Sequence, residues 1–404
     1  MRVFVVGGSG TVGRDVIGLL APSDLVSHIG VAGRNRAHAE KAAAAIGVKG
    51  TAVHADASDE QDLAQRLAGY DLVVNAATDE TVMPVLRSAI KAGVHYCDVN
   101  LVDEATELTA EAEEAGITAI IRNGIGPGLS NLMGMHVARQ LDEVRQLQRG
   151  MASLINFDPL NEVTSLSWLH DPDASRVLLH EFAPFMIWML EMMQENGRRT
   201  MLDLQHGQWL EVDPIDQGVV VPYDGGIGLT YPFASLDSFW QALPTELAEL
   251  APMEMWFSTL PPQADAVLRE QTRRMVDDGI DPGTAVGAFF DVVDADPQGW
   301  LTVPDGYIPV PIMWLRAIGH KDGRPARSDC WISALLPELP GWFLTNAALA
   351  AAALKMLQGE VTRPGVMTAE QAFDPESFFD ELAGLLPQPP SDGHLLSRSF
   401  HWLD

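Results

Sequence analysis

The sequence predicts an α/β fold with a parallel sheet in its first 128 residues, followed by a second domain of the α+β type. Short runs typical of buried strands alternate with helical segments up to residue 122. Helical segments are followed by Gly47, Gly93 and Gly116, and glycine is the residue that most often ends a helix. Strands that alternate with helices indicate βαβ units, whose strands run parallel.

Strands and helices alternate throughout the first domain. Apolar, β-branched runs predict strands over residues 2–6, 28–32, 51–54, 71–75, 94–99 and 118–122. Helical spacing of apolar residues predicts helices over residues 14–20, 36–46, 60–68, 82–92 and 105–115.

After Gly128 the pattern changes to longer apolar stretches with many tryptophans and prolines. We predict helices over 129–141, 345–357 and 377–386, and strands that include 207–212 and 328–335. The tail, 387–404, contains proline clusters and is expected to pack irregularly. The expected domains are residues 1–128, an α+β domain of residues 129–340, and a C-terminal segment of residues 341–404.

The composition is that of a globular protein with a large excess of negative charge. The 404 residues are 47% hydrophobic and 20% charged, with a net charge of −29. This charge repels nucleic acid and anionic membranes, and no apolar run reaches the roughly 18–20 residues of a membrane span. No signal peptide precedes the first strand, and the chain has only two cysteines. We therefore expect a cytoplasmic protein without disulfides.

Gly8, Ser9, Gly10, Thr11, Val12 and Gly13 form a GxGxxG motif between the first strand and the first helix. A plain tight turn is the alternative, but the strand–turn–helix context is the one that a dinucleotide requires. The glycines let the backbone approach a pyrophosphate, and the helix start offers N–H groups and a partial positive charge. The motif predicts a Rossmann domain with a doubly wound sheet.

The end of the second strand indicates which dinucleotide is bound. A site for NAD usually has an acidic residue about 20 positions after the glycines, where it binds the ribose 2′-hydroxyl. Here Arg34, Asn35 and Arg36 occupy this region. A guanidinium can pair with a 2′-phosphate, so NADP(H) is favoured. Two alternatives stay open: Arg34 covers the adenine of NAD, and Arg36 is a solvated residue of the next helix.

Small and polar residues at two further strand ends complete the predicted cofactor site. Asp56 and Ala57 follow the third strand, where a carboxylate could accept from the adenine amino group. Asn75, Ala76 and Ala77 follow the fourth strand and leave room for the cofactor. For Asp56, a helix cap or turn residue is the alternative.

These residues, with several further motifs, resemble the saccharopine dehydrogenase (saccharopine reductase-like) family of NAD(P)-dependent oxidoreductases. The matching pieces are Val5-Val6-Gly7-Gly8-Ser9-Gly10, Ala32-Gly33-Arg34, Asp56-Ala57-Ser58-Asp59, Gly69-Tyr70-Asp71-Leu72-Val73-Val74-Asn75-Ala76, Ala92-Gly93-Val94-His95-Tyr96-Cys97-Asp98, Gly124-Ile125-Gly126-Pro127-Gly128-Leu129-Ser130-Asn131 and Gly365-Val366. Many relatives carry an aspartate where this chain has Gly126.

The resemblance implies an arrangement of domains and a type of reaction. It implies that residues 129–340 form an inserted domain for substrate binding and dimerisation, and that the C-terminal segment packs back on the Rossmann domain. It also implies hydride transfer to or from a C=N bond of an amino-acid-like molecule. Two alternatives stay open: a reductase of a C=C or C=O bond in an apolar metabolite, and a regulatory protein that binds NADP(H) without turnover.

Candidate acid–base residues lie at the end of the fifth strand, where the nicotinamide is expected. Tyr96 could donate a proton or orient the substrate, and Asp98 could hold a substrate ammonium. The alternatives are an aromatic core residue and a turn cap. Cys97 is expected to be a small buried residue, and no histidine has a partner at metal-ligand spacing, so we predict no metal.

Candidate substrate-binding residues follow the sixth strand. Arg122 could bind a carboxylate, although an arginine at a strand end is more often a surface residue. Pro127, Gly128, Ser130 and Asn131 begin the next helix, whose N–H groups could hold a carboxylate or the nicotinamide amide. Ser130 could equally be an ordinary first-turn residue. A homodimer is the default expectation for the assembly.

Overall fold

The protein is described by a computed structural model that forms two compact units. The structure describes residues 1–153, 201–205, 208–212, 219–223, 226–232, 253–259, 262–302, 313–332, 343–387 and 394–403, with single residues at 173, 176, 180, 183 and 187. The first unit combines Met1–Leu132 with Trp342–Leu395, and the second combines Met133–Gly341 with Leu396–Asp404.

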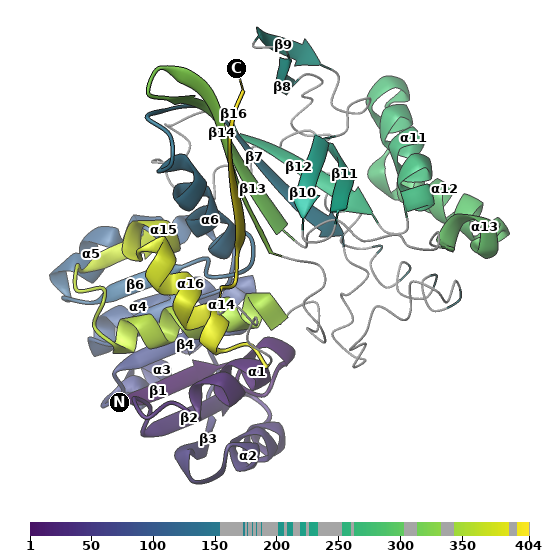
Figure 1. The fold of residues 1–404 in the computed structure, drawn as a ribbon. Coiled ribbons are helices and arrows are strands. Elements are labelled where there is room, and N and C mark those ends of the chain that lie inside the picture. The colour runs from purple at the N-terminus through teal and green to yellow at the C-terminus, as the bar shows by residue number, and fades with distance from the viewer. Residues whose placement is uncertain are drawn as a thin grey trace. The chain divides into compact units, whose positions relative to one another are not determined.

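The first unit is built on a seven-stranded parallel sheet (Figure 1). Its strand order is β15-β6-β5-β4-β1-β2-β3. The strands are β1 (Arg2–Val6), β2 (His28–Gly33), β3 (Gly50–His54), β4 (Leu72–Asn75), β5 (His95–Asp98), β6 (Thr118–Ile121) and β15 (Gly365–Thr368). The chain runs outward from β1 in both directions, so the strand order reverses between β1 and β4. Doubly wound sheets bind their ligands at this switch point, outside the carboxyl ends of the strands.

Helices connect these strands as the sequence predicts. They are α1 (Thr11–Leu20), α2 (Arg36–Ala45), α3 (Glu60–Leu67), α4 (Val82–Ala92) and α5 (Thr109–Glu114), with 3-10 turns η1 (Gly47–Lys49), η2 (Asp79–Thr81) and η3 (Asp103–Leu108). The helix expected over 105–115 is therefore split into η3 and α5. After β6, α6 (Leu129–Ala138) leads toward the second unit.

Residues 342–395 of the C-terminal segment belong to the first unit, as the resemblance implies, whereas residues 396–404 belong to the second unit. Residues 342–395 contain α14 (Phe343–Leu357), β15, α15 (Ala369–Ala372) and α16 (Pro375–Gly384). Helix α14 contacts α1, β4, β5 and α16 (Figure 1). It is rich in alanine and almost wholly buried, which fits a helix covered on more than one side. Strand β15 pairs in parallel with β6 and was not among the strands predicted from the sequence.

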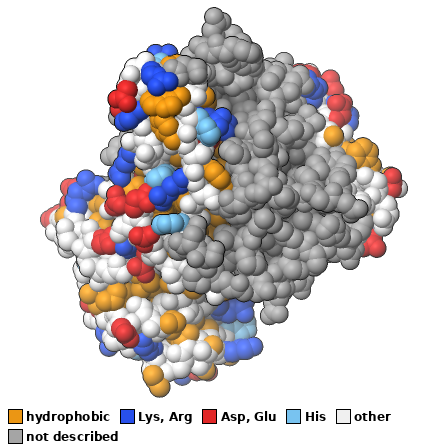
Figure 2. Space-filling view, in the orientation of Figure 1, with side chains coloured by type: hydrophobic (Ala, Val, Ile, Leu, Met, Phe, Trp, Pro, Cys, Tyr) orange, Lys and Arg blue, Asp and Glu red, His pale blue; other side chains and the backbone are white. Residues whose placement is uncertain are grey.

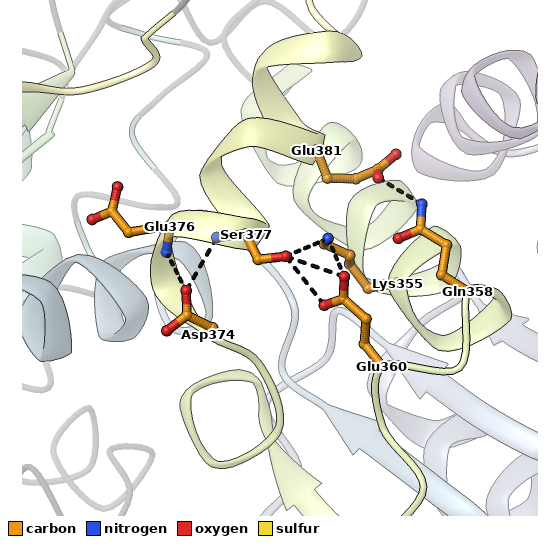
Figure 3. A network of polar contacts seen from close by, with 7 residues as sticks. All are labelled: Lys355, Gln358, Glu360, Asp374, Glu376, Ser377 and Glu381. Atoms are coloured by element: carbon orange, nitrogen blue, oxygen red, sulfur yellow. Dashed lines mark hydrogen bonds and ion pairs between the residues drawn. The ribbon is translucent and has the colours of Figure 1, made fainter.

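A network of polar contacts links α14 to α16 (Figure 3). The Lys355 ammonium donates to Glu360 Oε1 at 2.5 Å and to Ser377 Oγ at 2.6 Å. The Ser377 hydroxyl also lies 3.1 Å from Glu360 Oε1. Asp374 caps the start of α16 by accepting from the N–H of Ser377 at 3.2 Å. The side chain of Lys355 is only 7% exposed, so its charge is compensated inside the fold.

The second unit contains a mixed sheet in the order β10-β11-β12-β7-β13-β14-β16. Its strands are β7 (Glu143–Ser153), β10 (Val219–Tyr223), β11 (Gly226–Pro232), β12 (Met253–Thr259), β13 (Met313–Lys321), β14 (Arg324–Ile332) and β16 (Ser397–Trp402). Strands β7 and β12 run parallel and the other pairs antiparallel. The described elements also include a hairpin of β8 (Met201–Gln205) and β9 (Gln208–Val212), and helices α11 (Pro262–Asp278), α12 (Pro282–Ala295) and α13 (Pro297–Leu301).

The expectation of an irregular C-terminal tail is wrong for its last residues. Residues 397–402 form β16, which pairs antiparallel with β14. The proline clusters end before this segment. Polar Ser397, Ser399 and His401 then alternate with Arg398, Phe400 and Trp402, a period of two that suits an edge strand.

Charged side chains of both signs are interspersed over the described part of the surface in Figure 2. Among the described residues, no helix combines the length and hydropathy needed to cross a membrane.

Candidate functional site

The turn between β1 and α1 is shaped for close approach of a ligand to the backbone. Gly7 has φ +73°, a conformation that favours glycine. A Cβ atom at Gly13 would lie 2.2 Å from the carbonyl oxygen of Gly7, so only glycine fits there. No side chain of the described residues caps α1 at Gly10. The first N–H groups of this helix are thus not used by a capping side chain, as a phosphate site requires.

Arg34 and Asp56 lie at the neighbouring carboxyl ends of β2 and β3. Ala55 donates its N–H to the carbonyl of Gly33 at 3.3 Å, which brings the residues after both strands together. Arg34 is exposed and makes no hydrogen bond or ion pair with a described residue. The Ser58 N–H and hydroxyl hydrogen bond to Asp56 and, with the nearby charge of Arg34, lower the pKa of its carboxyl group. Arg34 therefore fits the 2′-phosphate of NADP(H).

The two residues after Arg34 have local roles in α2. The side chain of Asn35 caps the helix by accepting from the N–H of His38 at 3.1 Å. Arg36 forms an exposed ion pair with Glu40, with 2.9 Å between Nε and Oε1. Asp56 likewise accepts from the Ser58 hydroxyl at 2.7 Å and forms a turn. These contacts match the structural alternatives named above for Arg36 and Asp56.

Asn75 organises the turn after β4. It is fully buried, its Nδ2 donates to Thr81 Oγ1 at 3.0 Å, and its Oδ1 accepts from the N–H of Ala77 at 3.2 Å. The N–H of Ala76 is bound to the carbonyl of Val6 at 3.0 Å. The end of β4 therefore lies directly beside the glycine turn. A Cβ atom at Gly7 would lie only 2.9 Å from the carbonyl oxygen of Ala76.

Tyr96 and Asp98 form a fully buried pair at the end of β5. The Tyr96 hydroxyl donates to Asp98 Oδ2 at 2.7 Å and lies 3.4 Å from Asn75 Nδ2. The other carboxylate oxygen, Oδ1, accepts from the N–H of Arg122 at 2.8 Å. Burial raises the pKa of Asp98 to about 6, against the opposing effect of these hydrogen bonds. Burial and the charge of Asp98 raise the pKa of Tyr96 as well.

Arg122 is buried rather than on the surface. Its backbone is left-handed, with φ 63°, and its side chain is 4% exposed and paired with Asp103. Burial lowers the pKa of Arg122, while the negative charges of Asp98 and Glu370 oppose this shift. Its Nε finds no acceptor among the described residues.

The segment from Gly124 to Gly128 folds back on the start of α6. Gly126–Pro127 is a cis peptide, and a Cβ at Gly128 would lie 2.7 Å from the carbonyl oxygen of Gly124. The N–H groups of Leu129 and Ser130 bind the carbonyls of Gly124 and Ile125, at 2.9 and 3.0 Å. These N–H groups are already used, which argues against the expectation that they hold a carboxylate.

Sequence reasoning missed several buried polar residues around Asp98 and Arg122. Asn131 donates to Glu370 Oε1 at 3.1 Å, and the Thr368 hydroxyl donates to the same oxygen at 2.7 Å. Asn123 donates from Nδ2 to the carbonyl of Asp98 at 3.1 Å. Glu370 lies more than 230 positions after its partner in the chain, so no local pattern signals this contact. Within the described residues, no group of three His, Cys, Asp or Glu side chains could hold a metal.

Comparison with known proteins agrees with this geometry. Residues 3–120 match the saccharopine dehydrogenase NADP binding domain family. The chain is 30% identical over 151 residues to saccharopine dehydrogenase [NADP(+), L-glutamate-forming] of Saccharomyces cerevisiae, a stretch that covers 37% of this chain and 32% of that protein. It is 30% identical over 138 residues to the enzyme of the same name from Pyricularia oryzae, covering 34% of this chain and 29% of the relative. The aligned stretches span about a third of these relatives.

The likeness extends over the whole fold. The structure of apo saccharopine dehydrogenase (L-Glu forming) from Saccharomyces cerevisiae superposes with a TM-score of 0.63 at 15% identity, covering 99% of both chains. At this identity the match concerns the fold alone. The family match, the glycine turn and the exposed Arg34 agree on the cofactor. Residues 3–120 therefore match a saccharopine dehydrogenase NADP-binding domain, and the resemblance seen in the sequence is confirmed for this part of the chain.

Proposed function

We propose that the protein is an NADP-dependent oxidoreductase that transfers a hydride to or from a C=N bond of an amino-acid-like small molecule. The proposal rests on the match of residues 3–120 to an NADP-binding domain, together with a turn after β1 that admits only glycine at position 13 and an exposed Arg34 after β2. The names of the relatives at 30% identity support the class of reaction.

The residues at the strand ends fit NADP(H), and a different group of residues suits each part of the cofactor. The N–H groups at the start of α1 would hold the pyrophosphate, and Arg34 would hold the 2′-phosphate. Asn75, Ala76 and Ala77 at the end of β4 would line the cofactor site. When bound, the nicotinamide supplies or accepts the hydride.

Reduction of a C=N bond also requires a proton on nitrogen, and Asp98 is the proposed proton holder. Its pKa of about 6 lets it gain and lose a proton near neutral pH. Tyr96 is a positioning residue, because its hydroxyl donates to Asp98 and is buried with it. Arg122, and the side chains of Ser130 and Asn131, remain the proposed substrate-binding groups beside this carboxyl group.

Calorimetric titration with NADPH and NADH tests the cofactor assignment. We expect Arg34→Ala to weaken NADPH binding roughly 10–100-fold, the loss of a charge-assisted contact to phosphate, and to leave NADH binding unchanged. Arg66→Ala, which removes an exposed arginine paired with Asp62, is the matched control. Equal losses for both dinucleotides would contradict the role of Arg34.

Turnover tests the chemistry. NADPH consumption is measured with pairs of amines and 2-oxo acids, and the reverse reaction with secondary amines. Asp98→Asn is expected to lower kcat by more than tenfold and to remove the limb near pH 6 from the pH profile of kcat. Tight NADPH binding without turnover on any of these pairs would favour a regulatory protein. Light scattering tests the expected homodimer.

A further inference from the structure

The start of helix α14 lies beside the carboxyl end of the parallel sheet in the first unit. The Cγ2 atom of Thr345 lies 3.6 Å from the place of a Cβ atom at Gly124, which follows the end of β6. Asn346 Nδ2 donates to Asp15 Oδ2 at 2.6 Å, and Asp15 is in the second turn of α1. The first turn of α14 thus contacts both the segment after β6 and the helix that begins at the glycine turn (Figure 1).

Two polar atoms in this turn are buried without a partner. Thr345 is 7% exposed and Asn346 is 0% exposed. Neither the Thr345 hydroxyl nor Asn346 Oδ1 has a hydrogen-bond partner among the residues that the structure describes. A carboxylate only accepts hydrogen bonds, so the contact with Asp15 fixes which side of the Asn346 amide carries the nitrogen. The oxygen of this amide is therefore left to accept from another group.

The two atoms together indicate a ligand that both donates and accepts. Buried polar groups are nearly always paired, because an unpaired one is unfavourable. Asn346 Oδ1 can only accept, so it requires an N–H or O–H group, whereas the Thr345 hydroxyl can donate to an oxygen. A primary amide offers both kinds of group. A carboxylate would offer no donor to Asn346 and would be repelled by Asp15.

The nicotinamide half of the cofactor carries such an amide. In the proposed site the pyrophosphate lies at the start of α1, and Arg34 holds the adenosine half beyond β2. The other half then extends toward β4 and β5, the strands that α14 contacts. We infer that Thr345 and Asn346 bind the carboxamide of the nicotinamide. Asn346 Oδ1 accepts from its NH2 group, and the Thr345 hydroxyl donates to its carbonyl oxygen.

This inference rests on the proposed function and deepens it. The carboxamide is attached to the ring that carries the hydride, so binding it restricts the rotation of the ring about its bond to the ribose. This rotation decides which face of the ring is presented to the substrate. The C-terminal segment would therefore orient the reactive ring, through a residue that lies 331 positions after Asp15.

NADP+ and its acetylpyridine analogue are the probes, because a methyl group replaces the amide NH2 in the analogue. Binding of each to the full-length protein is measured by calorimetry. We expect the unchanged protein to bind NADP+ about tenfold more tightly than the analogue. Asn346→Ala should weaken NADP+ binding about tenfold and leave the analogue unaffected, so that the preference disappears.

Thr345→Val provides a second test with a different pattern. Valine keeps the shape of threonine without the hydroxyl, and both probes retain the carbonyl oxygen to which that hydroxyl donates. The variant should therefore weaken both probes by similar factors and preserve the preference for NADP+. Urea unfolding checks that each variant is folded. Gln358→Ala is the matched control, because Gln358 directly follows α14 and its side chain bonds Glu381 instead; it should bind both probes as the unchanged protein does.

Equal affinity of the unchanged protein for the two probes overturns the inference. So does a preference for NADP+ that persists in folded Asn346→Ala, as a purely structural contact between α1 and α14 would produce. Neither result affects the cofactor assignment, because NADP+ still binds in both cases. Failure of both dinucleotides to bind refutes the proposed function and this inference with it.

Discussion

Burial and hydrogen bonding have opposite effects on the pKa of the Asp98 carboxyl group. Its two carboxylate oxygens accept from Tyr96 and from the N–H of Arg122, and both bonds favour the charged form. Complete burial favours the neutral form and prevails, so the pKa rises from 3.8 to about 6. A carboxyl group of this kind binds its proton more tightly in the folded protein than in the unfolded chain.

This linkage predicts how stability depends on pH. Because the folded pKa is raised, the contribution of Asp98 to stability is complete below pH 4 and is lost as pH rises through about 6. The difference of about two units corresponds to roughly 3 kcal/mol. Urea unfolding of the unchanged protein and of Asp98→Asn, between pH 4 and pH 7, measures this contribution of Asp98 to the free energy of unfolding.

The stability of Asp98→Asn relative to the unchanged protein should therefore increase with pH across this range. The asparagine has lost one acceptor oxygen, so its absolute stability can be lower at every pH. The slope of the difference is the decisive quantity. A difference that does not vary between pH 4 and pH 7 would show that Asp98 does not titrate there.

Gly13 and Gly18 provide a matched pair within α1. A Cβ at Gly13 would lie 2.2 Å from the carbonyl oxygen of Gly7, whereas a Cβ at Gly18 would meet nothing within 4 Å. We expect Gly13→Ala to destabilise the protein by about 1–3 kcal/mol or more and to abolish NADPH binding. Gly18→Ala should stabilise it by up to about 1 kcal/mol, through helix propensity. Thermal unfolding and calorimetry measure both, and NADPH binding by Gly13→Ala would refute the close-approach argument.

At the scale of elements, the contact between α14 and α16 depends on one buried ammonium group. Lys355→Met keeps the apolar stem but leaves Glu360 and Ser377 without their cation. We expect a loss of about 1–3 kcal/mol in the free energy of unfolding, measured in urea. Gln358→Ala, which removes an exposed hydrogen bond to Glu381, should cost less than about 1 kcal/mol.

The double variant Lys355→Met/Glu360→Gln separates the two contributions to this loss. It removes the carboxylate that Lys355 compensates, so part of the stability should return. No recovery would mean that Lys355 acts through packing rather than through its charge.

At the scale of the whole molecule, the first unit is closed by a segment from the other end of the chain. Strand β15 adds to the edge of the sheet, and α14 covers α1, β4 and β5. Deleting residues 343–404 should therefore abolish the folding of the first unit and NADPH binding, although the predicted cofactor residues all lie before residue 78. Deleting residues 396–404 removes only β16 from the second unit and should preserve NADPH binding. A soluble fragment of residues 1–132 that binds NADPH would contradict this.

The sequence alone predicts the features of this protein that are local in the chain. The glycine turn, the position of Arg34 and the alternation of strands and helices each follow from residues within about 30 positions of one another. Local geometry and propensity decide such features, because a βαβ unit contains its own turn, helix and pairing partner. The α/β fold and the NADP(H) cofactor could therefore be predicted without coordinates.

Only the tertiary structure decided which polar groups meet at the end of the sheet. It buries Tyr96 with Asp98, brings Glu370 to Asn131 across 239 positions, and places Trp314 opposite Trp331 in the sheet of the second unit. A group's burial, and hence its pKa, depends on what covers it, and this covering comes from segments far away in the chain. The sequence predicted where chemistry would occur in the first unit, whereas packing determined which side chains are available to perform it.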